Sequence, residues 1–113
     1  MAQKKLQRFA DLKTFTNVLE YPKEMQGKWS GFFKNTNPVI LELACGRGEY
    51  TVGMAGLFPQ QNCIGVDVKG NRMYIGAKKC LEEKITNAAF LRTQIEMLTD
   101  YFKKHKVNRS KAT

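Results

Sequence analysis

Three short segments of the chain are almost entirely apolar, and longer segments with apolar residues at helical spacing follow them. The apolar segments are residues 39–43 (VILEL), 63–66 (CIGV) and 88–92 (AAFLR). Strands that are buried on both faces of a parallel sheet read as continuous apolar runs of this kind. The pattern therefore predicts three buried strands with helices between them.

The helical segments are predicted over residues 49–58, 72–83 and from 93 onward. In the first, one apolar face is expected to contain Tyr50, Met54, Leu57 and Phe58. In the second, the corresponding residues are Tyr74, Ala77 and Leu81. Thr93 and Glu96 have the spacing of a capping box, which predicts a third helix with Ile95, Leu98 and Phe102 on one side.

This order of elements predicts an α/β fold whose first half is a parallel three-stranded sheet with helices. Right-handed crossovers place successive strands side by side and bring their carboxyl ends to one edge, where open α/β sheets bind ligands. Residues 38–102 are expected to form this βαβαβα unit. Residues 1–37 are expected to be a basic extension that packs on it, and residues 103–113 a basic, disordered tail.

The charge of the chain is concentrated outside the central unit. The net charge is +9, divided as +4 over residues 1–37 (seven basic, three acidic), 0 over 38–102 (seven and seven) and +5 over 103–113 (five and none). Basic segments beside a neutral unit suit a polyanion such as nucleic acid. The candidate phosphate contacts in the first segment are Lys4, Lys5, Arg8 and Lys13.

Several classes of protein do not fit the composition. No apolar run approaches the roughly 20 residues that span a bilayer, and the N-terminus has no secretory pattern, so we expect a cytoplasmic protein without a membrane partner. The three cysteines Cys45, Cys63 and Cys80 lack CxxC spacing, which argues against a disulfide framework or a metal site.

The segment ELACGRG, residues 42–48, holds the candidate chemistry. Glycines after a first strand let a ligand approach the backbone, and an acid about 20 residues later commonly binds a ribose. Asp67 lies 19 residues beyond Gly48, at the end of the second predicted strand. Nicotinamide dinucleotides and S-adenosylmethionine both carry such a ribose.

The carboxylate of Glu42 favours S-adenosylmethionine over a dinucleotide. A dinucleotide places an anionic pyrophosphate against the glycine turn, where Glu42 would repel it. S-adenosylmethionine presents an ammonium and a sulfonium instead. The dinucleotide pattern GxGxxG is also incomplete, because Thr51 stands at its last glycine.

The segments LELACGRGEYTVGMA, CIGVDVKGNR and NAAFLRTQIEML together resemble the bacterial tRNA (guanine-N7)-methyltransferases over about residues 6–102. This resemblance implies a Rossmann-like class I methyltransferase fold, S-adenosylmethionine as cofactor and tRNA as partner. It implies methyl transfer to guanine N7, with this chain supplying the cofactor-binding half. The cofactor contacts that it implies are Glu42, Ala44, Gly46, Gly48, Asp67, Val68, Gln94 and Ile95.

The chain departs from the family pattern at three points. Ala44 replaces the first glycine of the turn, and Gln94 with Ile95 replaces the usual Asp-Ala after the third strand. The chain also ends before the later strands and the segment that supplies the family's catalytic-site aspartate, so no catalytic residue is assigned. We therefore expect a truncated fold that either self-associates through an exposed sheet edge or is unstable alone.

Three other interpretations remain open from the sequence. One is a non-catalytic tRNA-binding remnant, which would bind through its basic arms without cofactor. Another is a methyltransferase with a different substrate, which would keep Glu42 and Asp67. A nicotinamide oxidoreductase is the third, and it would bind NAD in place of S-adenosylmethionine.

Overall fold

A computed structural model describes residues 2–102 and 107–109, and a parallel β-sheet forms its centre. The strand order is β1-β4-β3-β2-β5, and every pair is parallel. The bounds are β1 Val18–Glu20, β2 Val39–Leu43, β3 Asn62–Asp67, β4 Ala88–Arg92 and β5 Val107–Arg109. The predicted parallel α/β fold class is confirmed, and the three predicted strands correspond to β2, β3 and β4.

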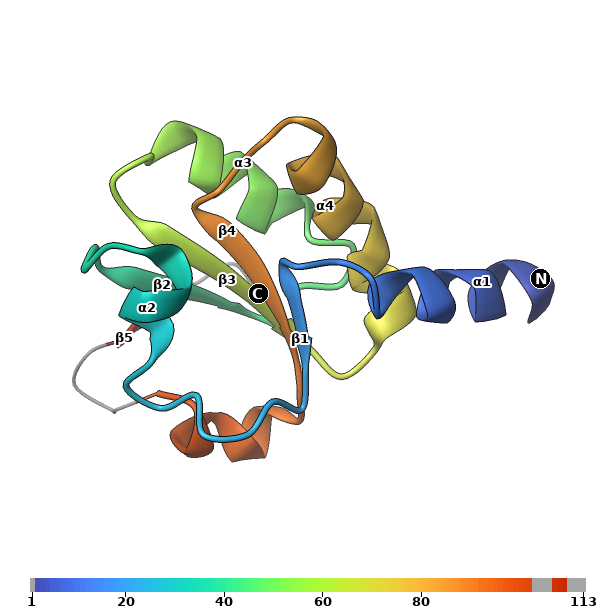
Figure 1. Ribbon diagram of the computed structural model, residues 1–113, viewed down its shortest axis with the longest axis horizontal. Helices are drawn as coiled ribbons and strands as arrows, with labels where there is room; N and C mark the ends of the chain where they lie inside the picture. Colours follow the sequence, from blue (N-terminus) through green and yellow to red (C-terminus); the bar gives the residue numbers. More distant parts are fainter. Residues whose placement is uncertain (1, 103–106, 110–113) are drawn as a thin grey trace.

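Helices cover both faces of the sheet (Figure 1). Helices α3 (Glu49–Leu57) and α4 (Gly70–Glu82) lie on one face, while α2 (Trp29–Phe33) and the 3₁₀ helix η1 (Ile95–Asp100) lie on the other. The carboxyl end of helix α1 (Ala2–Leu12) packs against α4, and the amino end of α1 extends away from the body.

Alternation along the strands divides the hydrophobic core into two layers. Ala88 and Phe90 of β4 face the layer under α3 and α4, whereas Ala89 and Leu91 face the layer under α2 and η1. Because side chains on a strand point alternately to opposite faces, a strand between two helical layers must be apolar at every position. This requirement explains why the continuous apolar runs located β2, β3 and β4.

The sheet has more strands than the three predicted. The expected extension, residues 1–37, contributes β1, which pairs with β4 from Val18 opposite Phe90 to Glu20 opposite Arg92. The tail was expected to be disordered from 103 to 113, yet residues 107–109 form β5 beside β2; 103–106 and 110–113 lie outside the described residues. Both additional strands have only three residues, too few for a distinctive hydrophobic pattern.

The apolar faces predicted for the helices are partly wrong. In α3 the buried residues are Thr51, Val52 and Ala55, while the predicted Tyr50, Leu57 and Phe58 are exposed. Small side chains face the sheet there because it lies very close: a Cβ on Gly65 of β3 would be 2.9 Å from Thr51 Oγ1. In α4 the buried residues are Gly70, Met73, Gly76, Ala77 and Cys80, and the predicted Leu81 is exposed.

The predicted third helix is a 3₁₀ helix, and its predicted capping box does not form. Gln94 is the N-cap residue of η1 and makes no side-chain capping bond. Thr93 instead lies in the loop directly after β4, where it is buried and its backbone N–H donates to Asp67 O at 3.0 Å. Leu98 and Phe102 are buried as expected, whereas Ile95 is exposed.

Candidate functional site

Three loops meet at the carboxyl edge of β2, β3 and β4 through backbone and carboxylate contacts. The turn after β2 is fixed to β3 by Cys45 N, which donates to Val66 O at 2.9 Å. The same turn is fixed to the loop after β3 by Gly46 N, which donates to Asp67 Oδ2 at 2.8 Å. The loop after β4 joins them through Thr93 N, which donates to Asp67 O. The predicted juxtaposition of the glycine turn and Asp67 is therefore confirmed.

The carboxylate of Asp67 organises two loops at once. Besides Gly46 N, it accepts hydrogen bonds from Val68 N at 2.7 Å and Lys69 N at 3.1 Å, both through Oδ1. Charge-assisted bonds of this kind are about twice as strong as neutral ones. Each carboxylate oxygen has two acceptor positions, so Oδ2 can accept a further donor from a ligand.

Glu42 is held against the first turn of α3. Its Oε1 accepts hydrogen bonds from the backbone N–H of Thr51, at 3.1 Å, and from the hydroxyl of the same residue. A carboxylate in this position meets an otherwise unpaired N–H and the positive end of the helix dipole. Burial nevertheless raises the pKa of Glu42, and the two hydrogen bonds from Thr51 offset only part of that increase.

The glycine turn itself has a left-handed backbone at three alternate positions. Ala44, Gly46 and Gly48 have φ values of 58°, 57° and 79°. Gly48 also lies in close contact with the core, since a Cβ there would be 2.5 Å from the ring of Phe90. Ala44 adopts the conformation without being glycine, at a cost of about 1–2 kcal/mol. This alanine is a strained position in the turn.

The other predicted contacts border the same edge. Val68 follows Asp67 directly and is 43% exposed, and Ile95 is 40% exposed at the start of η1. Gln94 is exposed between Ile95 and the buried Thr93. The backbone bond from Thr93 to Asp67 keeps these three side chains close to the loop after β3. Two apolar side chains, Val68 and Ile95, and the amide of Gln94 are therefore accessible to solvent beside Asp67.

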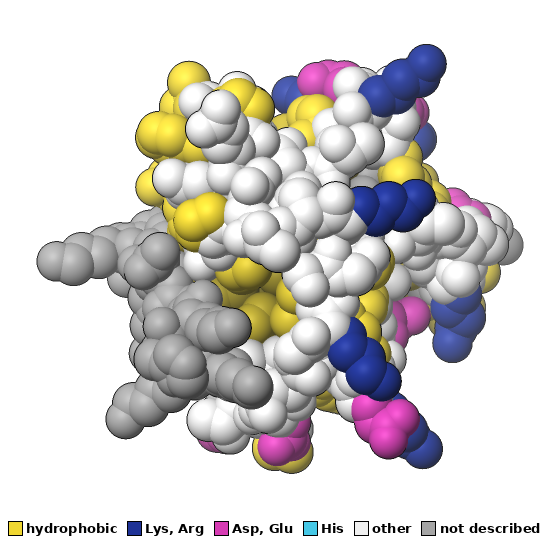
Figure 2. Space-filling view, turned by 60° about the vertical axis from the view of Figure 1, so that its left-hand side comes forward, with side chains coloured by type: hydrophobic (Ala, Val, Ile, Leu, Met, Phe, Trp, Pro, Cys, Tyr) yellow, Lys and Arg dark blue, Asp and Glu magenta, His cyan; other side chains and the backbone are white. Residues whose placement is uncertain are grey.

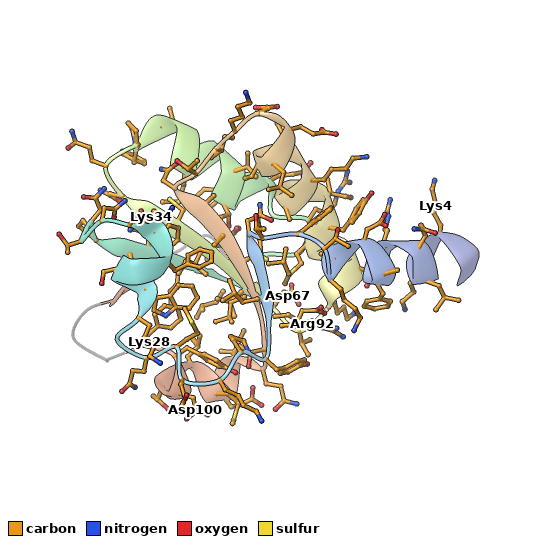
Figure 3. All side chains as sticks on the ribbon, in the orientation of Figure 1. Lys4, Lys28, Lys34, Asp67, Arg92 and Asp100 are labelled. Atoms are coloured by element: carbon orange, nitrogen blue, oxygen red, sulfur yellow. The ribbon has the colours of Figure 1, made fainter. Side chains whose placement is uncertain are left out.

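Arg92 is an additional residue at this edge that the sequence did not indicate. It pairs with Asp67 in the register of β3 and β4, and Figure 3 shows the two labelled side chains close together. Its guanidinium binds Glu20 Oε2 at 2.7 Å and Val68 O at 3.1 Å. It also lies over the rings of Phe9 and Tyr21, at 5.2 and 5.6 Å from their centroids. Arg92 therefore ties α1 and β1 to the loop after β3.

Arg72, in the first turn of α4, is a second residue that the sequence pattern missed. Its guanidinium Nη2 lies 3.5 Å from the position that a Cβ on Gly46 would occupy. The side chain is exposed, so it covers the glycine turn from the solvent side. Nothing in the apolar periodicity of α4 indicates this contact, because it depends on the reach of a long polar side chain.

Cys45 lies inside the same turn but is not suited to nucleophilic chemistry. Burial raises the pKa of its thiol strongly, and the charges of Asp67 and Glu42 raise it further. The positive charge of Arg72 opposes that increase only in part. The thiol stays protonated and acts as a small buried side chain.

The predicted nucleic-acid contacts lie on and just after α1. Lys4, Lys5 and Lys13 are exposed, and Figure 3 shows Lys4 near the outer end of the helix. Arg8 is only partly exposed, and its guanidinium lies 5.3 Å from the ring centroid of Tyr74 in α4. Three of the four residues are therefore accessible, while Arg8 contributes to packing between two helices.

A cavity lies at the opposite, amino-terminal edge of the sheet. Its lining includes Trp29, Pro38, Val39, Asn62 and Phe102. Figure 2 shows a hollow with a hydrophobic floor on this side of the molecule. The cavity is remote from the glycine turn and Asp67, because β2 and β3 run between the two edges.

No helix in the described part of the chain is long and apolar enough to cross a membrane.

The curated proteins that this chain resembles in sequence share one name. The tRNA (guanine-N(7)-)-methyltransferase of Bacteroides fragilis is 47% identical over 117 residues, which cover 96% of this chain and 46% of that protein. The protein of the same name from Cytophaga hutchinsonii is 47% identical over 106 residues, covering 90% of this chain and 48% of that protein. The chain thus spans about half the length of the curated relatives it matches.

Solved structures share the fold at lower identity. The antibiotic-resistance methyltransferase Kmr aligns with a TM-score of 0.55 and 23% identity, covering 62% of this chain and 38% of that one. The 30S ribosomal A1408 methyltransferase from an uncultured bacterium aligns with a TM-score of 0.56 and 22% identity, covering 69% and 36%. These alignments confirm the fold class expected from the sequence.

A family model described as "Putative methyltransferase" matches residues 36–111. The matched range contains the glycine turn, Asp67 and the loop after β4. These are the elements that hydrogen bonds bring together at one edge of the sheet. On this match, the chain belongs to the putative methyltransferase family.

Proposed function

We propose that the chain binds S-adenosylmethionine at the carboxyl edge of β2, β3 and β4. The observation that carries the proposal is the hydrogen bond between Gly46 and Asp67, which joins a glycine turn to an acid at the next strand end. Two carboxylates, Glu42 and Asp67, border the turn, which disfavours a pyrophosphate and favours a cationic ligand. An NAD-dependent enzyme is therefore the weaker alternative.

Each predicted contact has a role in this proposal. Asp67 accepts a hydrogen bond from a ribose hydroxyl, and Glu42 attracts the ammonium and sulfonium of the methionine part. Gly46 and Gly48 let the ligand approach the backbone, with Ala44 at the entrance of the turn. Val68, Gln94 and Ile95 border the adenine, whose edge an amide can both donate to and accept from.

We further propose that the methyl group goes to guanine N7 of tRNA. The names of the two curated relatives support this substrate, and a tRNA substrate is consistent with a cytoplasmic protein. In the reaction, the N7 lone pair attacks the methyl carbon as its bond to sulfur breaks, which leaves S-adenosylhomocysteine and a positively charged 7-methylguanine. Such a transfer depends on positioning more than on acid–base catalysis, and no catalytic residue is assigned.

The exposed lysines of α1 are proposed to contact tRNA phosphate. Helix α1 projects from the body, which makes Lys4 and Lys5 accessible to a large polyanion (Figure 1). Replacing both with glutamate should weaken tRNA binding at least tenfold and reduce its salt dependence. The control is Lys28→Glu, an exposed lysine that Figure 3 shows on the opposite side of the molecule from Lys4. Equal losses in both variants would contradict a specific role for α1.

We also propose that the chain self-associates through the edge of its sheet. Strand β1 is the last described strand on its side of the sheet, and an unpaired strand edge is a template for pairing with another chain. Light scattering coupled to size-exclusion chromatography tests this directly. A monomeric mass at all concentrations would contradict it.

The experiment that tests the proposed function is methyl transfer to tRNA. The chain, extended by the carboxyl-terminal half that its curated relatives have, is incubated with unmodified tRNA and S-adenosylmethionine labelled in the methyl group, and the digested nucleosides are identified by mass spectrometry. The proposal predicts labelled 7-methylguanosine. A label in another nucleoside would indicate a methyltransferase with a different substrate. tRNA binding without cofactor binding or transfer would indicate a tRNA-binding remnant.

A further inference from the structure

Arg72 places a positive charge directly over the glycine turn. Its Nη2 and Cζ lie 3.5 and 3.7 Å from the position that a Cβ on Gly46 would occupy, so the guanidinium lies next to Gly46 of the turn. The salt bridges among the described residues involve Arg47, Lys79 and Arg92, and none includes Arg72. An exposed guanidinium held at the site in this way is available to a ligand.

Neither acidic side chain of the site, Glu42 or Asp67, forms a salt bridge with Arg72. Both oxygens of Asp67 already accept backbone N–H donors, and Glu42 is bound to Thr51 below the turn. The turn contains another cation, Arg47, but its side chain lies 3.9 Å from Glu49 at the surface. Among the described residues, Arg72 is therefore the guanidinium that lies next to the turn and forms no salt bridge.

The proposed cofactor carries one group that the contacts assigned so far do not satisfy. The methionine end of S-adenosylmethionine bears an ammonium and a carboxylate on the same carbon. Glu42 suits the ammonium, but two carboxylates near the turn would repel the carboxylate of the ligand unless a cation lies between them. A guanidinium matches a carboxylate with two parallel hydrogen bonds, which a lysine cannot reproduce.

We propose that Arg72 binds the carboxylate of the cofactor's methionine part and so selects amino-acid-bearing sulfonium ligands. The inference rests on the proposed function, because it concerns the same site. It assigns a binding role, and Arg72 takes no part in the transfer of the methyl group.

The test compares S-adenosylmethionine with decarboxylated S-adenosylmethionine by calorimetric titration. The two ligands share the adenosine, the sulfonium and the amine, and they differ in the carboxylate. The chain should bind the first at least about tenfold more tightly, as expected for a charge-assisted pair. In Arg72→Gln this preference should fall below about threefold, with little change for the decarboxylated ligand, and Arg72→Lys should retain part of it.

Arg47→Gln is the matched control, since it removes a neighbouring guanidinium that is paired with Glu49. It should keep the full preference. Circular dichroism melting curves establish that each variant is folded, and Arg72→Lys replaces Arg72→Gln if the latter does not fold.

The outcomes separate this inference from the proposed function. Binding of S-adenosylmethionine with an unchanged preference in Arg72→Gln overturns the inference alone. An equal loss for both ligands also overturns it, because it would indicate a contact to the ribose or a structural role. Failure of the folded wild-type chain to bind either ligand overturns both proposals.

Discussion

The carboxylate of Asp67 accepts a hydrogen bond from the backbone nitrogen of Gly46 at 2.8 Å, across 21 positions of the sequence. One side chain at the end of β3 thus fixes the shape of the turn that follows β2. The same carboxylate also orders the start of its own loop through Val68 and Lys69. The site is therefore preorganised: the acid expected to meet a ribose also holds the glycine turn that would receive the rest of the cofactor.

Any side chain at Gly76 of α4 should destabilise the fold, because the glycine turn packs directly against this position. A Cβ at Gly76 would lie 2.8 Å from Arg47 O and 2.9 Å from the ring of Phe90. Gly76→Ala should lower the free energy of unfolding by about 2 kcal/mol through overpacking, measured by urea denaturation. Gly53→Ala is the control, since no atom lies within 4 Å of its Cβ position in α3. It should stabilise the chain by up to about 1 kcal/mol; equal effects of the two would contradict the packing argument.

At the entrance of the turn, the reverse substitution, Ala44→Gly, should stabilise the chain. Its φ of 58° favours glycine, so Ala44→Gly should relieve strain. The relief, about 1–2 kcal/mol, exceeds the entropic cost of glycine, about 0.5–1 kcal/mol. Thermal unfolding should therefore show a melting temperature higher by a few degrees. A lower melting temperature would mean that the methyl group of Ala44 contributes packing that outweighs the strain.

The sequence located the centre of the fold and the centre of the site for the same physical reason. Strands buried on both faces must be apolar throughout, and parallel strands bring Gly46 and Asp67 to one edge. Strand β1 was missed because three half-buried residues carry no such pattern. The face of α3 was misjudged because contact with Gly65 requires small side chains such as Thr51, which hydrophobicity does not reveal. Arg72 and Arg92 were missed because their contacts depend on three-dimensional reach.

The wild-type chain, with Glu42, should be less stable at neutral pH than a Glu42→Gln variant. Burial raises the pKa of Glu42 in the folded chain above the value of 4.5 for an unperturbed glutamate. The folded state then binds more protons than the unfolded state above about pH 4.5, so this contribution to stability falls as pH rises through that range. Glu42→Gln should remove this pH dependence and raise the stability at pH 7 by on the order of 1 kcal/mol.

The measurement for Glu42→Gln is urea denaturation between pH 4 and pH 8. Glutamine keeps an acceptor for the Thr51 donors, so the capping contact to α3 can persist. Glu96→Gln, at an exposed position in η1, serves as the control and should change the stability by less than about 0.5 kcal/mol. A Glu42→Gln chain that is less stable than wild type at pH 7 would contradict this account of the buried acid.

The three thiols should be unreactive in the folded chain. All are buried, and burial raises the pKa of Cys63 and Cys80 to about 11 and that of Cys45 further. Alkylation requires the thiolate, so iodoacetamide at pH 8 should label each cysteine at least about 100-fold more slowly than in the denatured chain. Mass spectrometry of time points measures this. Rapid labelling of Cys45 in the folded chain would indicate a reactive thiol at the site.

The most direct test of the central claim is a calorimetric titration of the chain with S-adenosylmethionine, with Asp67→Ala measured beside it. The account predicts binding by the wild-type chain and at least a tenfold loss in Asp67→Ala, because that variant loses both a ribose acceptor and the bond to Gly46. Lys28→Glu, remote from the turn, should bind as wild type does. Equal binding by Asp67→Ala, or no binding by a folded wild-type chain, would contradict the claim that this edge of the sheet is a cofactor site.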